Sequence, residues 1–378
     1  MINRKKIIRA VTVSQSLGFC RNVMIGMRTK GYEMMAVSSP GQELDNLKKQ
    51  DGFYCVAVPM QRHISLLKDI KSLVQLIKIF ELEKPFVVHS MTPKAGMLCM
   101  LAAWIVRVPC RIHTFTGLVW PTSTGFSRKL LMFTDWVTCA CATHIIPEGQ
   151  GVKNDLQKYI TKKPMKVLGY GNVRGVDMEF WTKKENVQRD VSKFNFIFVG
   201  RVVRDKGIKE LIQAFSKLNE KYSHAHLFLV GAYEDDLDPI DPETRGHIAS
   251  NPAIEAVGRK NKYELIDYYS ISDCFVFPSY REGFPNTVLE AGAMGLPSIV
   301  TDINGSNEII EQGKNGLIVA SKDAEALYSA MEKMLTDNEC RQKMASNARP
   351  MIASRFEQGY VQKCLYDFYE EILIKDNN

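Results

Sequence analysis

The sequence lacks the features that would place it at once in a specialised class of protein. Its nine cysteines are odd in number, scattered and mostly set in apolar runs, so they do not have the spacing of a disulfide framework. Cys139 and Cys141 are also too close together for a zinc knuckle. We therefore expect small, buried thiol side chains and a reducing compartment.

Long apolar runs are missing as well. The longest, residues 95–106, is well short of the roughly 18 apolar residues that a membrane-spanning helix needs. Arg9 and Thr12 interrupt the first apolar run, residues 7–13, which is typical of a strand and not of a signal peptide. We expect a cytoplasmic protein, with peripheral contact at the inner face of the cytoplasmic membrane still permitted.

Acidic residues are scarce in the first half of the chain. Residues 1–170 contain 24 Lys and Arg against 10 Asp and Glu, whereas the remainder contains 25 against 32. A basic surface attracts nucleic acid, anionic lipid headgroups or phosphorylated substrates, or it is only a solvated face. No aromatic and basic interleaving of a nucleic-acid module is present, so we expect no nucleic-acid partner.

Strand-like and helix-like segments alternate through both halves of the 378 residues. This alternation predicts an α/β fold with two Rossmann-like, doubly wound domains that face each other across a cleft. A Gly-rich strip followed by a charged run, ending near residue 193, marks the boundary. We expect domains at residues 1–172 and 194–356, a linker at 173–193 and a last helix within 357–378.

Three segments of the first half combine apolar and basic residues. Residues 65–82 have an apolar stripe at helical spacing with Lys68, Lys71 and Lys78 elsewhere, and residues 94–107 and 127–138 are strongly apolar beside Lys and Arg. Such helices lie either at a bilayer interface or in the core of the domain. Both interpretations are kept open.

The most informative stretch is residues 274–301, which reads as a strand, a loop, a helix and a second strand. Ligands of open parallel sheets bind where such a loop leads into a helix. Glu282 in the loop and Glu290 in the helix suit hydrogen bonds from sugar hydroxyls. Thr287 and Glu290 also have the spacing of a capping box, in which the glutamate only satisfies a backbone amide.

Three spaced motifs carry a resemblance to a known family. They are Gly200-Arg201 with Lys206-Gly207, the Glu282-Gly-Phe-Pro-Asn286 loop with Glu290, and Gly292-x-x-Gly295-x-Pro297. Together they resemble family 4 of the retaining glycosyltransferases, of the bacterial capsule or O-antigen type. The resemblance covers essentially the whole chain and implies the GT-B fold, with the last helix crossing back to the first domain.

The resemblance also implies a role for each matching residue. Arg201 and Lys206 would clamp the diphosphate of a nucleotide sugar, Glu282 would hold donor hydroxyls, and Glu290 would take the ribose. The implied catalytic residues are His113, Glu282, Arg201 and Lys206. The implied donor-binding residues are Gly18, Gly258, Arg259, Gly283, Phe284, Pro285, Asn286, Thr287 and Glu290.

The function that follows is the transfer of a sugar, with retention, from a nucleoside diphosphate sugar such as a UDP-sugar to a glycan or a polyprenyl-diphosphate-linked glycan. We expect no cofactor and no metal, because the Arg and Lys clamp would replace the ion. Two alternatives remain open: an epimerase of GT-B fold that acts on a UDP-sugar, and a non-catalytic protein that binds sugar nucleotides.

Overall fold

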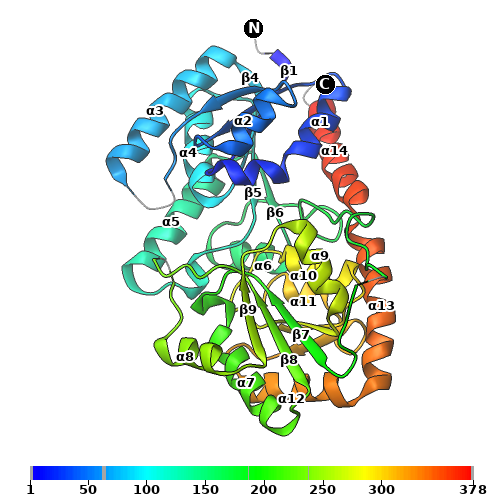
Figure 1. Ribbon diagram of the computed structural model, residues 1–378. Helices are drawn as coiled ribbons and strands as arrows, with labels where there is room; N and C mark the ends of the chain where they lie inside the picture. Colours follow the sequence, from blue (N-terminus) through cyan, green and yellow to red (C-terminus); the bar gives the residue numbers. More distant parts are fainter. Residues whose placement is uncertain (1–2, 62–64, 186, 237, 376–378) are drawn as a thin grey trace. The chain divides into compact units, whose positions relative to one another are not determined.

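The computed structural model describes residues 3–61, 65–185, 187–236 and 238–375, which divide into two compact units (Figure 1). Unit 1 comprises residues 1–174 and 361–378, and unit 2 comprises residues 175–360. Each unit contains one six-stranded sheet with helices around it. The fold class predicted from the alternation is confirmed.

The sheet of unit 1 is parallel throughout, with the strand order β3-β2-β1-β4-β5-β6. Because the chain runs outward from β1 in one direction and then crosses to β4 on the other side, the switch point of the sheet lies between β1 and β4. The strands are β1 (Asn3–Ala10), β2 (Glu33–Ser38), β3 (Tyr54–Ala57), β4 (Pro85–Met91), β5 (Cys110–Phe115) and β6 (His144–Pro147).

Helices cover both faces of this sheet, because successive side chains of a strand point to opposite faces. Ile8 and Ala10 of β1 belong to one apolar cluster, and Ile7 and the following Val11 belong to another. The first cluster includes α3 (Leu66–Glu83), α4 (Pro93–Ile105), α5 (Gly125–Cys141) and α6 (Gln150–Tyr159). The second includes α1 (Arg21–Thr29), α2 (Gln42–Lys49) and α14 (Gln358–Lys375).

The last helix completes the core of unit 1. Tyr369 of α14 is fully buried, and its hydroxyl accepts a hydrogen bond of 2.8 Å from the guanidinium of Arg9 on β1. The Arg9 side chain also lies against Cys20, at 3.2 Å, and against His89 of β4. The end of the chain therefore returns to the unit in which the chain begins, as the resemblance implies.

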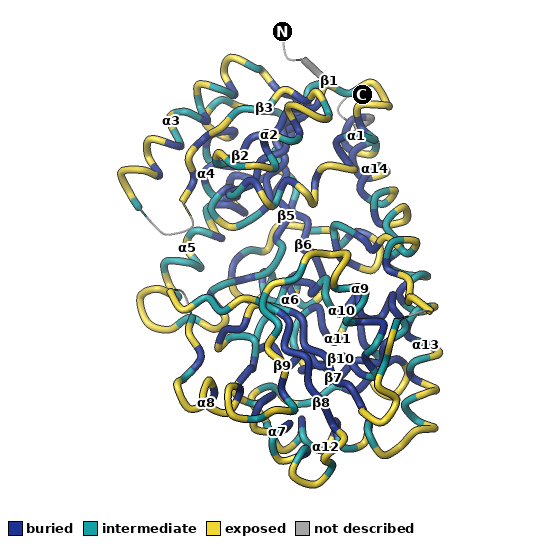
Figure 2. The backbone as a smooth tube through the Cα atoms, viewed as in Figure 1, coloured by how far each residue is buried: buried dark blue, intermediate teal, exposed yellow. Residues whose placement is uncertain are grey.

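The sheet of unit 2 repeats the same topology. Its order is β12-β11-β10-β7-β8-β9, so its switch point lies between β7 and β10. The strands are β7 (Phe194–Val199), β8 (Ala225–Val230), β9 (Ile254–Gly258), β10 (Cys274–Phe277), β11 (Ser298–Thr301) and β12 (Gly316–Val319). The central strands are buried along their whole length (Figure 2), which is why they read as continuous apolar runs.

The helices of unit 2 follow its strands in the order expected for a doubly wound sheet. They are α7 (Ile208–Lys221), α8 (Pro242–Ser250), α9 (Lys262–Ile271), α10 (Asn286–Ala293), α11 (Ser306–Ile309), α12 (Ala324–Thr336) and α13 (Asn338–Phe356). A short 3-10 helix, η3 (Arg204–Lys206), precedes α7, and η1 (Ser14–Phe19) precedes α1.

The stretch 173–193, expected above to be a linker, is packed largely against unit 2. Val176 and Trp181 belong to its apolar core, and Arg349 of α13 donates a hydrogen bond of 2.6 Å to the carbonyl of Trp181. Residue 186 of this stretch lies outside the described residues. The stretch is polar on average, but Val176 and Trp181 attach it to the core of unit 2.

Candidate active site

The loop after β7 is brought close to the loop after β10 by a glycine. Gly207 has φ +69°, and a Cβ on it would lie 2.1 Å from the carbonyl oxygen of Pro278. Only glycine fits this close approach and takes this conformation without strain, which explains why a glycine follows Lys206. The approach sets Lys206 beside the loop that carries Glu282.

Lys206 and Glu282 form an ion pair at the switch point of unit 2. Glu282 Oε1 also accepts a hydrogen bond of 2.7 Å from the hydroxyl of Ser279, which is fully buried. The Lys206 and Glu282 side chains are 14% and 15% exposed, so solvent reaches only part of them. Two residues 76 positions apart in sequence are thus brought together, while the ligand roles implied for them remain predictions.

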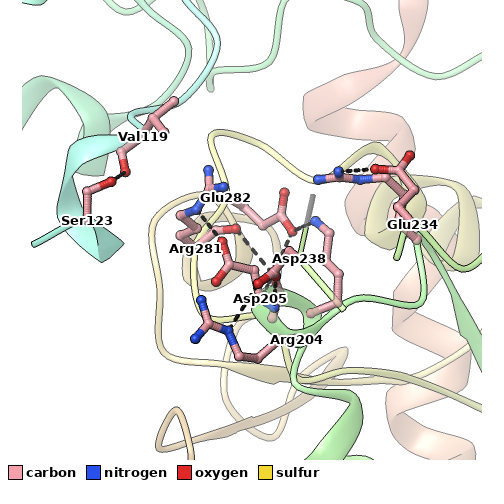
Figure 3. A network of polar contacts seen from close by, with 11 residues as sticks. Val119, Ser123, Arg204, Asp205, Glu234, Asp238, Arg281 and Glu282 are labelled. Carbon is pink, nitrogen blue, oxygen red and sulfur yellow. Dashed lines mark hydrogen bonds and ion pairs between the residues drawn. The ribbon is translucent and has the colours of Figure 1, made fainter. Parts of the chain in front are cut away.

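Further polar contacts hold the two loops in place (Figure 3). Arg281 donates to the carboxylate of Asp205 at 2.8 Å, and the backbone amide of Tyr280 donates to the carbonyl of Asp205, also at 2.8 Å. Asp205 is therefore the point at which the β10 loop is tied to η3. Nothing in the sequence pattern singled out Asp205, Ser279 or Arg281, because their role depends on contacts between distant loops.

Arg201 is paired differently from Lys206. Its guanidinium donates to Glu234 at 2.8 Å, and the two side chains are 47% and 31% exposed. Figure 3 shows Glu234 with its partner, apart from the contacts of Asp205. An exposed pair of this kind contributes at most about 1 kcal/mol, so a bound anion can displace Glu234 at little cost.

The acidic loop after β8 also contains an Asp-x-Asp sequence, Asp236 and Asp238. Asp238 accepts from Arg204 at 3.0 Å and from the backbone amide of Asp205 at 2.7 Å. Within the described residues, no group of three or more His, Cys, Asp or Glu side chains is arranged to hold a metal ion. The observed contacts make Asp238 a support for η3.

The loop of residues 283–285 leads directly into α10. Phe284 is buried, and the backbone of Gly283 and Phe284 packs on Gly305, where a Cβ would lie 2.3 Å from the Gly283 carbonyl oxygen. The N-cap residue of α10 is Pro285, and no side chain caps the helix. The capping box of Thr287 and Glu290 is therefore wrong, because the helix begins two residues too early for Thr287 to be its N-cap.

Glu290 lies in the second turn of α10, 8% exposed. The pKa of Tyr269 is raised mainly because that residue is buried, and the charge of Glu290 is the second cause. The ribose role remains a prediction for this residue.

Gly258 and Arg259 lie where β9 ends, beside the end of β8. The backbone amide of Gly231, the residue after β8, donates to the carbonyl of Gly258 at 3.0 Å. Arg259 is exposed. Both residues are at the carboxyl edge of the sheet that carries Lys206 and Glu282, although at a different strand.

Comparison with known proteins assigns the chain to a family. The family model described as "Glycosyl transferases group 1" matches residues 179–351, and "Glycosyl transferase 4-like domain" matches residues 19–171. The "Capsular polysaccharide biosynthesis glycosyltransferase CapM" of Staphylococcus aureus is 33% identical over 380 residues, covering 98% of each chain. The chain belongs to the family 4 glycosyltransferases.

Another relative is similar over most of the chain, and solved structures share its fold. A "UDP-Gal:alpha-D-GlcNAc-diphosphoundecaprenol alpha-1,3-galactosyltransferase" of Escherichia coli is 28% identical over 323 residues, 83% of this chain and 82% of that one. The fold is shared with sucrose-phosphate synthase from Thermosynechococcus elongatus, with a TM-score of 0.81, 18% identity and coverage of 98% and 100%. Anabaena HepE has a TM-score of 0.79 at 16% identity, with coverage of 97% and 100%.

In unit 1 of this glycosyltransferase, His113 is enclosed by protein. It is 1% exposed; its Nδ1 lies 2.8 Å from the Ser90 hydroxyl, and its ring packs edge-on against Phe115. A Cβ on Gly96 would lie 2.4 Å from the ring, so α4 passes directly over it. Burial lowers the pKa of His113 to about 3, so the imidazole is neutral near pH 7.

Gly18 of the same glycosyltransferase lies in η1, exposed to solvent. A Cβ there would meet no other atom of the chain within 4 Å. The chain itself therefore does not require a glycine at this position. The predicted approach of a diphosphate supplies a reason that the protein atoms do not.

Proposed function

We propose that this family 4 glycosyltransferase moves a hexosyl or N-acetylhexosaminyl group from a UDP-sugar, with retention, to a lipid-linked glycan in the synthesis of a cell-surface polysaccharide. The observation that carries the proposal is the Lys206 and Glu282 pair at the switch point of unit 2. One side chain suits a diphosphate and the other suits sugar hydroxyls, and they lie in contact.

The relatives support the choice of donor and acceptor. The name of the Staphylococcus aureus relative places it in capsular polysaccharide biosynthesis. The name of the Escherichia coli relative states a UDP-sugar as donor and a diphosphoundecaprenol-linked sugar as acceptor. Because both resemble this chain over most of its length, we extend these substrate classes to it.

In the proposed reaction, the Lys206 ammonium and the Arg201 guanidinium bind the diphosphate. Each already has a carboxylate partner, so donor binding replaces a protein anion with a substrate anion. As the bond between the sugar C1 and the phosphate oxygen breaks, negative charge grows on the leaving phosphate, and the two cations stabilise it. This role of the two cations is our reason for proposing that transfer requires no metal.

Glu282 serves as a binder of the donor sugar in this scheme, and not as a nucleophile. Its Oε1 accepts a hydrogen bond from the buried hydroxyl of Ser279, which fixes the carboxylate and lowers its reactivity when Lys206 binds the diphosphate. The leaving phosphate itself takes the proton from the acceptor hydroxyl, and the acceptor oxygen attacks C1 on the face that the phosphate leaves. The transition state is oxocarbenium-like.

A lipid-linked acceptor implies work at a membrane surface. We therefore include peripheral contact with the inner face of the cytoplasmic membrane through the basic first part of the chain, where 24 basic residues stand against 10 acidic ones in residues 1–170. Basic surfaces are attracted to anionic headgroups.

The experiment is incubation of the full-length protein with UDP- and GDP-sugars and polyprenyl-diphosphate-linked acceptors. Mass spectrometry should show one sugar added to the acceptor when a UDP-sugar is the donor. NMR of the product should show that the new linkage has the same anomeric configuration as the donor. EDTA should leave the rate of transfer unchanged. An inverted product would exclude retention, and loss of activity with EDTA would exclude metal independence. Epimerised donor formed without acceptor would identify an epimerase, and UDP binding without turnover a binding protein.

Glu290→Ala tests the ribose role. We expect a loss of kcat/KM of about tenfold or more, because a buried hydrogen-bonding group for the substrate is removed. The melting temperature reports separately on the contacts that this nearly buried carboxylate makes within the protein. A large fall in melting temperature, with kcat/KM of the remaining folded protein unchanged, would make Glu290 a structural residue.

A further inference from the structure

Exposed apolar side chains gather on one layer of unit 1. Ten of the seventeen large hydrophobic side chains that are exposed among the described residues lie on α3, α4 and α5. We call these ten the outer face of the α3–α5 layer: Leu66, Leu67, Ile70, Val74, Leu82, Trp104, Ile105, Phe126, Phe133 and Trp136. Soluble surfaces seldom concentrate such side chains without a binding partner.

The three helices form one continuous layer. Helix α4 packs on α3 on one side and on α5 on the other, and all three contribute to the same apolar cluster against the sheet. Their buried residues, such as Phe80 of α3 and Cys139 of α5, face that cluster. The outer face therefore points away from the sheet, and Figure 2 shows α3 mostly exposed or intermediate along its length.

On α5 the exposed residues make a single stripe. Phe126, Lys129, Phe133 and Trp136 recur at intervals of three and four residues, which places them on one side of the helix. The aromatic side chains are 79%, 57% and 51% exposed, and the rings of Phe133 and Trp136 are stacked with centroids 5.8 Å apart. Rings of this kind are enriched where water meets a bilayer.

On α3 the exposed side mixes apolar residues with lysine. Leu67, Ile70 and Val74 alternate with Lys71 and Lys78, all of them exposed. Among the residues of α3, α4 and α5, all of which the structure describes, Glu81 is the one exposed carboxylate; Asp69 and Asp135 are buried, and Glu83 is paired with Lys6. The layer is thus apolar and positively charged.

We infer that the outer face of the α3–α5 layer docks on an anionic lipid bilayer. The aromatic and aliphatic side chains would enter the boundary between headgroups and acyl chains, and the lysines would reach back to the headgroups. Lysine is depleted in the cores of protein–protein interfaces, so its interleaving with the apolar residues favours lipid over a protein partner.

The inference deepens the proposed function and rests on it in one respect, because a lipid-linked acceptor gives the enzyme a reason to lie on the bilayer. Among the described residues, no helix has the length and apolarity to pass through a membrane. The docking proposed is contact with one leaflet, through the layer made by the three successive helices that follow β3, β4 and β5.

The two exposed tryptophans provide a direct readout. The chain has four: Trp120 and Trp181 are 2% and 5% exposed, whereas Trp104 and Trp136, both on the outer face, are 56% and 51% exposed. Adding vesicles of phosphatidylglycerol and phosphatidylethanolamine should shift the fluorescence to the blue, and brominated acyl chains should quench it. Phosphatidylcholine vesicles should have a much weaker effect, and an unchanged spectrum with anionic vesicles would overturn the inference.

Variants then assign the binding to this face by vesicle flotation. Phe133→Ser with Trp136→Ser should weaken binding about tenfold or more, whereas Tyr54→Ser, an exposed aromatic on β3, should not. Lys71→Glu with Lys129→Glu should weaken it and reduce its salt dependence, whereas Lys48→Glu with Lys49→Glu should not. The last pair has the same charge change and lies on α2, against the other face of the sheet.

Two outcomes contradict the inference, and both are separable from failure of the proposed function. Flotation of the outer-face variants equal to wild type would exclude this face. A change of the outer-face variants from dimer to monomer in sedimentation velocity, with wild-type binding to vesicles, would assign the face to a second copy of the chain. UDP binding measured by calorimetry, without lipid, should be unchanged in all of these variants, so it reports on the donor site alone.

Discussion

The two units share one sheet topology but use their switch points in opposite ways. Between β7 and β10 of unit 2 lie paired charges, Lys206 with Glu282, supported by the pair of Asp205 and Arg281. Between β1 and β4 of unit 1, the side chains of Thr12 and Thr92 are 2.7 Å apart, and Thr12 also accepts from the amide of Ala95 at 3.1 Å. The difference indicates that a fold supplies the place, and that the residues there decide its chemistry.

The buried polar groups differ in the same direction. Unit 1 buries His89 and His113, and burial holds the pKa of each well below its usual value. Unit 2 leaves its central ion pair partly exposed. At the switch points themselves, the charged pair that a ligand can reach is in unit 2, whereas Thr12 and Thr92 of unit 1 are neutral, so substitutions at the two places should have different consequences.

The largest effect is expected for Lys206→Ala. Removing one cation from the leaving phosphate should lower kcat/KM by about 10²–10³-fold, measured with the UDP-sugar found to be the donor. Lys209→Ala, an exposed lysine three residues further on, is the matched control and should stay near wild type. If kcat/KM for Lys206→Ala equals that of the control, Lys206 does not stabilise the leaving phosphate, and the proposed difference between the two switch points is wrong.

The next effect is structural. Gly207→Ala should cost about 1–3 kcal/mol of unfolding free energy, because the residue has φ +69° and its Cβ would clash with the Pro278 carbonyl. Activity should fall too, since Lys206 would move away from Glu282. Gly246→Ala is the control: it lies in α8 with nothing within 4 Å of the new Cβ and should be neutral or slightly stabilising. Denaturant unfolding gives both values.

Acid should weaken unit 1 before unit 2. The unfolded chain binds a proton at His113 near pH 6.5, whereas the folded chain does so only near a pKa of about 3. Stability from this residue is therefore complete above pH 6.5 and falls as pH decreases, by about 2 kcal/mol at pH 5. Hydrogen exchange should show that opening of unit 1 becomes faster, relative to that of unit 2, when the pH is lowered from 7 to 5. Equal changes in both units would contradict the role of His113 in this loss of stability.

The smallest effect is expected at the other switch point. Thr92→Val removes a hydroxyl that lies 2.7 Å from that of Thr12 and accepts a hydrogen bond of 3.0 Å from the Thr12 amide, so it should cost about 1–2 kcal/mol and leave kcat/KM within about twofold of wild type. Thermal unfolding and steady-state rates measure the two. A loss of activity comparable to that of Lys206→Ala would show that both switch points bind substrate directly.

Much of the fold was predictable from the sequence, because buried parallel strands read as short apolar runs. The stretch 274–301 contains β10, α10 and β11, as its interpretation as a strand, a loop, a helix and a strand predicts, whereas β6, α2 and α6 are not among the segments singled out above. These three are short or have few apolar residues; α2, for instance, buries only Leu44 and Leu47. Their positions depend on the sheet already formed by their neighbours and leave little periodicity in the sequence.

The site was predictable where a local motif carried it. Lys206 and Glu282 belong to such motifs and do meet, but their supports Ser279, Asp205 and Glu234 are defined by contacts between distant loops. The capping box at Thr287 failed for a different reason. Its spacing is correct, but Pro285 sets the start of the helix, and sequence spacing alone does not reveal which residue is first.

The return of α14 to unit 1 has a consequence for the order of synthesis. Unit 2 is one continuous segment, residues 175–360, whereas unit 1 needs residues 361–378 from the end of the chain. A ribosome therefore delivers every part of unit 2 before it delivers the last part of unit 1, although unit 1 is started first. Until then the Arg9 guanidinium lacks Tyr369, and the cluster around it lacks Leu365, Phe368 and Ile372. A chain that ends before residue 361 would thus lack part of unit 1, the unit whose synthesis begins first.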